Sequence, residues 1–179
     1  MATCVVCSTQ NAPWSLWCVR CRAHLTHPNA GRLASPGRRL AAEVLELVVV
    51  VVMVLIAFVV AESLASPKTL ATTDDALPML VFWAHFPLYF LVRLALYTRG
   101  TSIGKALLGM HVVKTDGSTA GFWRMLFRES IGKWVSGLLL SIGFFWILFD
   151  GDRQGWHDKL AGTYVVKKSP VLYRVTTPV

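Results

Sequence analysis

Residues 37–63 decide the fold, and they read GRRLAAEVLELVVVVVMVLIAFVVAES. Residues 47–61 carry no charge, and 22 positions separate Arg39 from Glu62. At a helical rise of about 1.5 Å per residue, this length crosses a hydrocarbon core about 30 Å thick. Glu46 lies about two turns inside Arg39, where an unpaired carboxylate costs about 2.5–3.5 kcal/mol. The stretch therefore predicts a transmembrane helix whose inner carboxylate has either a partner or a function.

The overall composition also indicates an integral membrane protein. Of 179 residues, 54% are hydrophobic and 16% are charged, and the mean hydropathy is +0.52. Soluble domains carry about 25% charged residues. No cleavable signal peptide precedes the apolar stretch, so we expect the first span to insert as an uncleaved anchor.

The net charge of +8 is unevenly distributed along the chain. Residues 1–39 hold five arginines and no acidic side chain, residues 62–78 hold three acidic and one basic side chain, and residues 99–133 hold six basic and two acidic ones. Because basic loops stay in the cytoplasm, we expect a multi-pass protein of the cell membrane with a cytoplasmic N-terminus. The basic residues flank apolar segments and form no continuous stripe, which favours the lipid bilayer over DNA as partner.

All four cysteines lie near the N-terminus, as Cys4-x2-Cys7 and Cys18-x2-Cys21. Two such pairs at this spacing are typical of a tetrahedral zinc site. Disulfides and idle thiols are the alternatives, and a reducing cytoplasm argues against disulfides. Residues 1–22 are too few to bury a core, so we expect zinc to hold this knuckle together.

The cysteine spacing, with Asn11 between the pairs, resembles the small zinc finger named after a Ran-binding nucleoporin. The resemblance implies a possible protein or RNA partner at the knuckle. We expect Trp14 and Trp17 either to stack on such a partner or to cover the metal. His24 and His27 follow in a polar stretch rich in proline and glycine, and we interpret both as linker residues.

A second apolar stretch, LPMLVFWAHFPLYFLVRLALY at residues 77–97, predicts a returning transmembrane helix. Within it, His85, Tyr89 and Arg93 recur every fourth residue and so share one helical face. They form a possible polar path through the apolar layer.

The two predicted spans place Glu46 and Arg93 at similar depth near the cytoplasmic side. We therefore predict an intramembrane charged cluster in which Glu46 pairs with Arg93 and Arg39 lies at the rim. Glu43, four residues from Arg39 on the same helix, is expected to pair with that arginine. The cluster either binds or moves an ion, or it only stabilises the packing of the two helices.

The C-terminal half combines short strands with a third hydrophobic segment. Residues 107–114 and 160–168 are β-branched runs bounded by glycine, and we expect them to pair in a cytoplasmic β-element. Residues 121–149 begin amphipathic and end apolar, which favours a surface helix and then a re-entrant segment that bends near residues 141–143. A straight third crossing is the alternative.

These observations predict a mainly α, integral membrane helical protein with two transmembrane helices, a third spanning or re-entrant segment, a small cytoplasmic β-element and an N-terminal zinc knuckle. The expected domains are a zinc knuckle at 1–22, a flexible linker at 23–36, a transmembrane domain at 37–168 and a C-terminal tail at 169–179.

Several runs of sequence resemble one known family. They are GRRLAA at 37–42, GTSIGKALLGMHVV at 100–113, the Asp116-Gly117 turn, and HDKLAGTYVV at 157–166. Together they resemble the RDD family of small membrane proteins, which is named for one arginine and two aspartates. The resemblance places the arginine on Arg39, the first aspartate on Glu46 and the second on Asp158. Its other motif residues are Gly104, Lys105, Arg128, His157 and Thr163.

The resemblance implies transport of an unidentified ligand, or sodium/proton exchange as suggested for some members. We expect a transporter or ion exchanger that is a homo-oligomer, because two or three helices enclose little volume. The alternative is a membrane-anchored zinc finger that recruits a protein or RNA. The sequence has no nucleophile–base constellation or phosphate loop, so we expect no enzyme, and we interpret His157-Asp158 as a structural hydrogen-bonding pair.

Overall fold

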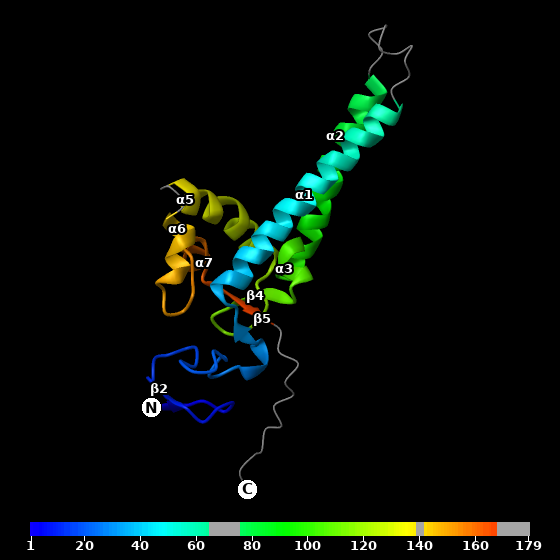
Figure 1. Cartoon of the computed structure of the whole chain (residues 1–179). Helices are drawn as coiled ribbons and strands as arrows, with labels where there is room; N and C mark the ends of the chain where they lie inside the picture. Colours follow the sequence, from blue (N-terminus) through cyan, green and yellow to red (C-terminus); the bar gives the residue numbers. More distant parts are fainter. Residues whose placement is uncertain (65–75, 139–141, 168–179) are drawn as a thin grey trace.

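The computed structural model describes residues 1–64, 76–138 and 142–167. Its longest elements are two helices, α1 (Pro36–Leu64) and α2 (Ala76–Thr98), which run side by side along their length (Figure 1). α1 begins at a proline, whose fixed φ suits the first helical turn, and then follows the predicted apolar stretch. Most of the outer loop and the C-terminal tail predicted from the sequence lie outside the described residues.

Among the described helices, the segment Pro36–Ser63 of α1 is long and apolar enough to cross a membrane. Phe122–Leu138 and Ile142–Leu148 would supply a second candidate if the two were one span, but their axes differ by 108°. The predicted break at residues 141–143 thus coincides with a sharp change of direction. The crossing by α2 stays a prediction.

A three-stranded antiparallel sheet lies at one end of the helix pair. Its strand order is β3 (Arg32–Leu33), β5 (Thr163–Lys167) and β4 (Met110–Lys114). The central strand β5 pairs along its whole length with β4 and over two residues with β3. The predicted pairing of the two β-branched runs is therefore confirmed.

The sheet fixes the path of the chain relative to the helices. β3 immediately precedes α1, and β4 follows α2 after the short helix α3 (Ile103–Leu107). The start of α1, the end of α2 and the strand β5 therefore lie at the same end of the molecule (Figure 1). The segment between β4 and β5 begins and ends at this sheet, because the two strands pair with each other. A straight third crossing would place its two ends on opposite sides of the membrane, so the structure disagrees with that alternative.

That segment is a bent helical unit whose first helix packs against α2. It comprises α4 (Phe122–Phe127), a π-helical turn η3 (Arg128–Gly132) and α5 (Lys133–Leu138), and then α6 (Ile142–Phe145) with a 3-10 turn. A Cβ added to Gly143 would lie 2.7 Å from the Ser136 Cα, so the two arms approach too closely for any larger residue. The helix α7 (Trp156–Ala161) packs against both arms and leads into β5.

The main core lies between the sheet and the ends of the long helices. It joins one face of β4 and β5 to the last turn of α2 and the buried side of α4. Its buried members are Ala34, Ala42, Tyr97, Met110, Val112, Ala120, Met125 and Val165. This core connects the two long helices to the sheet.

The N-terminal cysteine region packs against the other face of the sheet. It contains a short hairpin of β1 (Ala2–Thr3) and β2 (Gln10–Asn11). Residues 23–36, interpreted as a flexible linker, are instead an ordered connection that forms the turn η1 (Pro28–Ala30) and the edge strand β3. Polar composition and prolines indicate a loop, but they carry no information on pairing with a strand more than 100 positions away.

Candidate functional site

Nine charged side chains form one continuous network at the sheet end of the helix pair. Each is joined to another by an ion pair of 3.7 Å or less, and five are basic and four acidic. The members of this charge network are Arg39, Glu43, Glu46, Arg93, Lys105, Arg128, Glu129, Lys133 and Asp158. They come from α1, α2, α3, η3, α5 and α7, so the network connects almost every helix of the domain.

One end of the charge network is centred on Asp158 and is tightly held. Its Oδ2 accepts a hydrogen bond from Arg39 Nη1 at 2.7 Å, and its Oδ1 accepts one from Arg128 Nε at 2.7 Å. Asp158 is completely buried. Burial alone would raise its pKa, but Arg128, His157 and Arg39 hold the pKa of Asp158 well below its usual range. The carboxylate is therefore ionised, and it cross-links the start of α1 to the bent helical unit.

His157 lies beside this carboxylate but bonds elsewhere. Its Nδ1 is 3.2 Å from Ser136 Oγ, and its backbone N–H donates to the same oxygen at 3.0 Å. The distance from His157 Nε2 to Asp158 Oδ2 is 3.7 Å, so the predicted hydrogen-bonding pair is wrong. Burial, together with Arg128 and Lys133, lowers the pKa of His157 to about 4. The imidazole is neutral near pH 7 and has a packing role.

Four side chains form the middle of the network. Lys133 Nζ lies 2.6 Å from Glu129 Oε2 and 2.8 Å from Glu43 Oε2, and Lys105 Nζ lies 2.8 Å from Glu43 Oε1. The predicted local pair of Glu43 with Arg39 is wrong, because Glu43 faces the two lysines and Arg39 faces Asp158. Glu129 was missed from the sequence, although its spacing of four from Lys133 is a recognisable helical ion-pair signal.

Glu46 and Arg93 form the other end, and the predicted pair is present. Arg93 Nη2 lies 3.3 Å from Glu46 Oε1, and the second carboxylate oxygen accepts a 2.6 Å hydrogen bond from Ser102 Oγ. Among the described residues, buried side-chain atoms without a hydrogen-bond partner occur along the whole network: Glu46 Oε1 and Arg93 Nε at this end, Glu129 Oε2 in the middle and Arg39 Nε at the Asp158 end. The Glu46–Arg93 contact is nevertheless longer than the two 2.7 Å contacts of Asp158, so this end is held less tightly.

Arg93 also connects the network to the surface of α2. Its side chain is 26% exposed, against 1% for Lys105 and 2% for Arg128. The rings of Tyr89 and Tyr97 flank its guanidinium, each with its centroid 5.7 Å away. Of the predicted polar path, Tyr89 thus contacts Arg93, whereas His85 lies one turn further along α2.

Gly104 allows α3 to lie close enough to α1 for Ser102 and Lys105 to reach the charge network. A Cβ at this position would lie 1.9 Å from the Ala42 carbonyl oxygen, so the backbone of α3 rests directly on α1. This contact places Ser102 and Lys105 beside the carboxylates of α1. The remaining motif residue, Thr163, donates from its hydroxyl to the Asp158 carbonyl at 3.4 Å.

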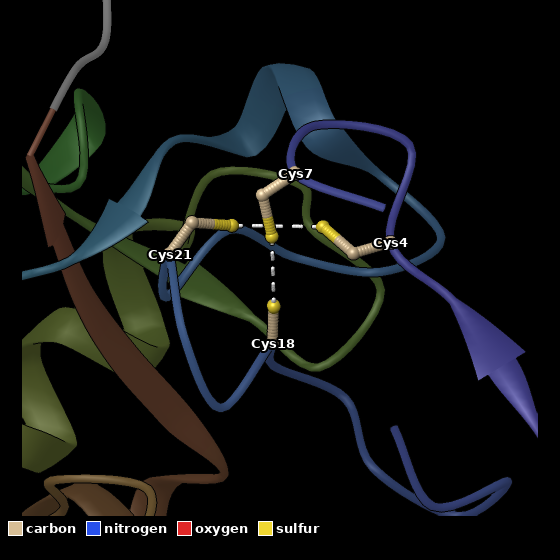
Figure 2. A group of neighbouring side chains, drawn as sticks. All are labelled: Cys4, Cys7, Cys18 and Cys21. Carbon is tan, nitrogen blue, oxygen red and sulfur yellow. Dashed lines mark hydrogen bonds between the residues drawn. The ribbon is translucent and has the colours of Figure 1, made fainter. Parts of the chain in front are cut away.

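The four cysteines form a candidate metal centre, separate from the charge network. Their sulfur atoms all lie within 4.8 Å of one another, and Cys4–Cys21 and Cys7–Cys18 are each 3.5 Å apart (Figure 2). Tetrahedral thiolate sites with metal–sulfur distances near 2.3 Å have about this spacing between sulfurs, so the residues fit a bound metal ion.

Asn11 fixes the geometry between the two cysteine pairs. Its Nδ2 donates to the Thr9 carbonyl at 2.8 Å, and its Oδ1 accepts from the Val19 N–H at 2.9 Å. The same side chain therefore holds a loop of each pair. The two tryptophans differ: Trp17 is buried against the sheet, whereas Trp14 is 83% exposed, so its stacking on a partner stays a prediction.

Comparison with known proteins gives a family but no activity. The profile of the RDD family matches residues 33–162. The uncharacterized protein RP437 of Rickettsia prowazekii is 35% identical over 71 residues, which cover 40% of this chain and 39% of that protein. The uncharacterized protein YckC of Bacillus subtilis is 33% identical over 87 residues, which cover 46% of this chain and 58% of that protein. No solved structure matches the chain.

Proposed function

The chain belongs to the RDD family, and from this premise we propose that it is a multi-pass membrane protein that moves an ion or small charged solute by rearranging its charge network. In this proposal α1 and α2 span the bilayer. The sheet and the cysteine centre lie in the cytoplasm, as the basic N-terminal segment favours. The bent unit of α4, η3, α5 and α6 lies at the cytoplasmic interface.

The exposed side chains of the bent unit support its interfacial placement. Trp123, Phe127, Ile131, Trp134 and Leu138 are each at least 40% exposed and recur at steps of three and four residues. They therefore form one apolar stripe along the helix, whose opposite side holds buried members of the charge network. An amphipathic helix with tryptophans on its apolar side is typical of the membrane interface.

The observation that carries the proposal is the unequal holding of the two ends of the charge network. At the Asp158 end, two 2.7 Å hydrogen bonds satisfy a buried carboxylate. At the other end, Arg93 Nη2 lies 3.3 Å from Glu46 Oε1, which is a longer contact, and the Arg93 side chain is 26% exposed, whereas that of Arg128 is 2% exposed. A charged pair within the membrane that is loosely held and partly accessible is typical of a site that binds or moves an ion. We therefore assign Glu46 and Arg93 to the working end and Arg39 to the structural end.

The experiment is ion flux through the purified full chain in lipid vesicles, with a sodium gradient and an internal pH-sensitive dye. Glu46→Gln keeps the shape of the side chain but removes its charge, and it should reduce flux at least about tenfold. Glu62→Gln is the matched control, because Glu62 lies exposed at the far end of the same helix. Unchanged flux in Glu46→Gln would remove Glu46 from this role, and no wild-type flux of any tested ion or charged solute would overturn the proposal.

We further propose that the cysteine centre binds zinc and that the metal holds residues 1–22 in their fold. Four thiolates in two tight turns are the donor set that structural zinc sites use. The metal content of purified protein should be one zinc per chain in the wild type and should fall on Cys18→Ser.

A homo-oligomer is the expected working unit. Leu47, Leu55 and Val59 of α1 are each at least 58% exposed in the single chain, and lipid or a second copy would cover them. The mass of the detergent-solubilised particle, corrected for bound detergent, distinguishes these two cases.

A second candidate function, recruitment of a protein or RNA by the cysteine region, is favoured by the exposure of Trp14. Exposed tryptophans are enriched at recognition surfaces. A specific partner should be lost on Trp14→Ala while metal content and flux remain unchanged.

A further inference from the structure

The cysteine region and the sheet share a small hydrophobic core. Trp17 is 3% exposed, and its ring centroid lies 5.2 Å from that of Tyr164 on β5. Leu33, Val113 and Val166 complete this core with side chains from all three strands of the sheet. Trp17 immediately precedes the cysteine ligand at position 18, so the metal centre is attached directly to this contact.

Two polar contacts extend the same interface. His24 is fully buried, and its Nε2 donates to the Thr115 carbonyl at the end of β4 at 3.1 Å. Arg22 Nη1 donates to the Gly151 carbonyl at 3.0 Å, in the turn before α7. His24 was interpreted as a linker residue, but its ring instead fixes the cysteine region to the sheet.

The strand that carries this interface also contacts the charge network. Alternate side chains of a strand point to opposite faces. Tyr164 and Val166 accordingly face the cysteine region, whereas Val165 belongs to the main core. The Val165 carbonyl accepts one hydrogen bond from the Ala34 N–H at 3.0 Å and another from Arg39 Nη2 at 3.3 Å. β5 therefore lies between the metal centre and the arginine that holds Asp158.

The backbone of the second cysteine pair positions this interface. The Cys18 N–H donates to the Ala23 carbonyl at 2.9 Å, and the Arg22 N–H donates to the Cys18 carbonyl at 3.0 Å. The Leu33 N–H in turn donates to the Arg22 carbonyl at 2.9 Å. Loss of a metal that orders this pair would release Trp17, His24 and the edge strand β3 together, because residues 1–22 are too few to stay folded by burial alone.

We propose that the cysteine region is a metal-dependent clamp, which docks through Trp17 and His24 on the sheet when metal is bound and thereby holds β5 and Arg39 in place. Metal occupancy thus regulates the structural end of the charge network. The docking itself is independent of the proposed transport, and only its effect on flux rests on that function.

The clamp is tested by hydrogen exchange on the purified full chain in lipid nanodiscs, with bound zinc and after removal by a chelator. Amides of β5 (Thr163–Lys167) and of β3 should exchange at least about tenfold faster without zinc, and zinc addition should restore them. Trp17→Ala should accelerate the same amides with zinc still bound. Trp14→Ala is the matched control, because Trp14 is exposed in the same region, and it should leave them unchanged.

Counting reactive thiols in parallel confirms that the metal has left. If four thiols become reactive and the exchange of β5 stays unchanged, the clamp is refuted, even if Trp17→Ala does not fold. Flux measured on the same samples separates the two proposals. Faster β5 exchange with no flux in any sample supports the clamp and overturns transport, whereas flux that depends on zinc without any change in β5 overturns the clamp.

Discussion

Replacing Asp158 with asparagine should destabilise the protein more than any exposed charge substitution. Asp158 is completely buried, and it compensates two guanidinium groups at 2.7 Å, those of Arg39 and Arg128. Asparagine keeps the volume but leaves a buried arginine without its counter-ion. Removing one partner of a buried ion pair costs about 3–5 kcal/mol. For a chain of this length, each 1 kcal/mol lowers the melting temperature by about 2–4 °C, so we expect a decrease of about 6–20 °C.

The measurement is thermal unfolding of the detergent-solubilised protein, followed by the loss of near-ultraviolet circular dichroism. Asp152→Asn is the matched control, because Asp152 is an exposed aspartate in the turn before α7. It should change the melting temperature by no more than about 2 °C. If Asp158→Asn unfolded at the same temperature as the control, the Asp158 end would not be the structural end of the network.

Gly104, His157 and Cys18 each give one further prediction. Gly104→Ala should lower the free energy of unfolding by about 1–3 kcal/mol in the same assay, because its Cβ would overlap the Ala42 carbonyl oxygen. Gly151→Ala is the control and should leave the free energy of unfolding unchanged, because the space around Gly151 is open. Because the pKa of His157 is about 4 in the folded state and about 6.5 when unfolded, its neutral form contributes roughly 3 kcal/mol of stability above pH 6.5. That contribution is lost as the pH falls from 6.5 to 4, and a His157→Gln variant whose stability fell equally steeply over this range would contradict it. Cys18→Ser should remove zinc from the purified protein and lower its melting temperature, and normal zinc content would contradict a four-cysteine site.

The sequence predicted those parts of the structure that depend on local patterns. Three such patterns are typical of few other structures. They are the apolar run of α1, the β-branched runs of β4 and β5, and the two cysteine pairs. The Glu46–Arg93 contact was also predictable, because two antiparallel helices of known length bring residues of equal depth together. These signals need only residue spacing and helix geometry.

The parts that were missed depend on contacts between distant residues. Arg39 was assigned to Glu43 because four positions separate them, but Asp158, 119 positions away, offers a completely buried carboxylate. In the sequence, Glu129 and Lys133 fit the polar side of a surface helix, and only their ion pairs with α1, α2 and α3 place them in the charge network. The composition of the segment before α1 predicts a linker, because its pairing with β5 leaves no local pattern.

The position of β5 between β3 and β4 has a consequence for biosynthesis. β3 and β4 do not pair with each other, so the sheet has no central strand until residues 163–167 leave the ribosome. By that time α1 and α2 are already synthesised. Arg39 therefore has no Asp158 to pair with until 119 more residues have been synthesised. A chain truncated before Thr163 would keep both long helices. It would lack β5, whose side chains Tyr164 and Val166 pack against Trp17 of the cysteine region. β5, the last of the described strands, is thus the one that completes the sheet.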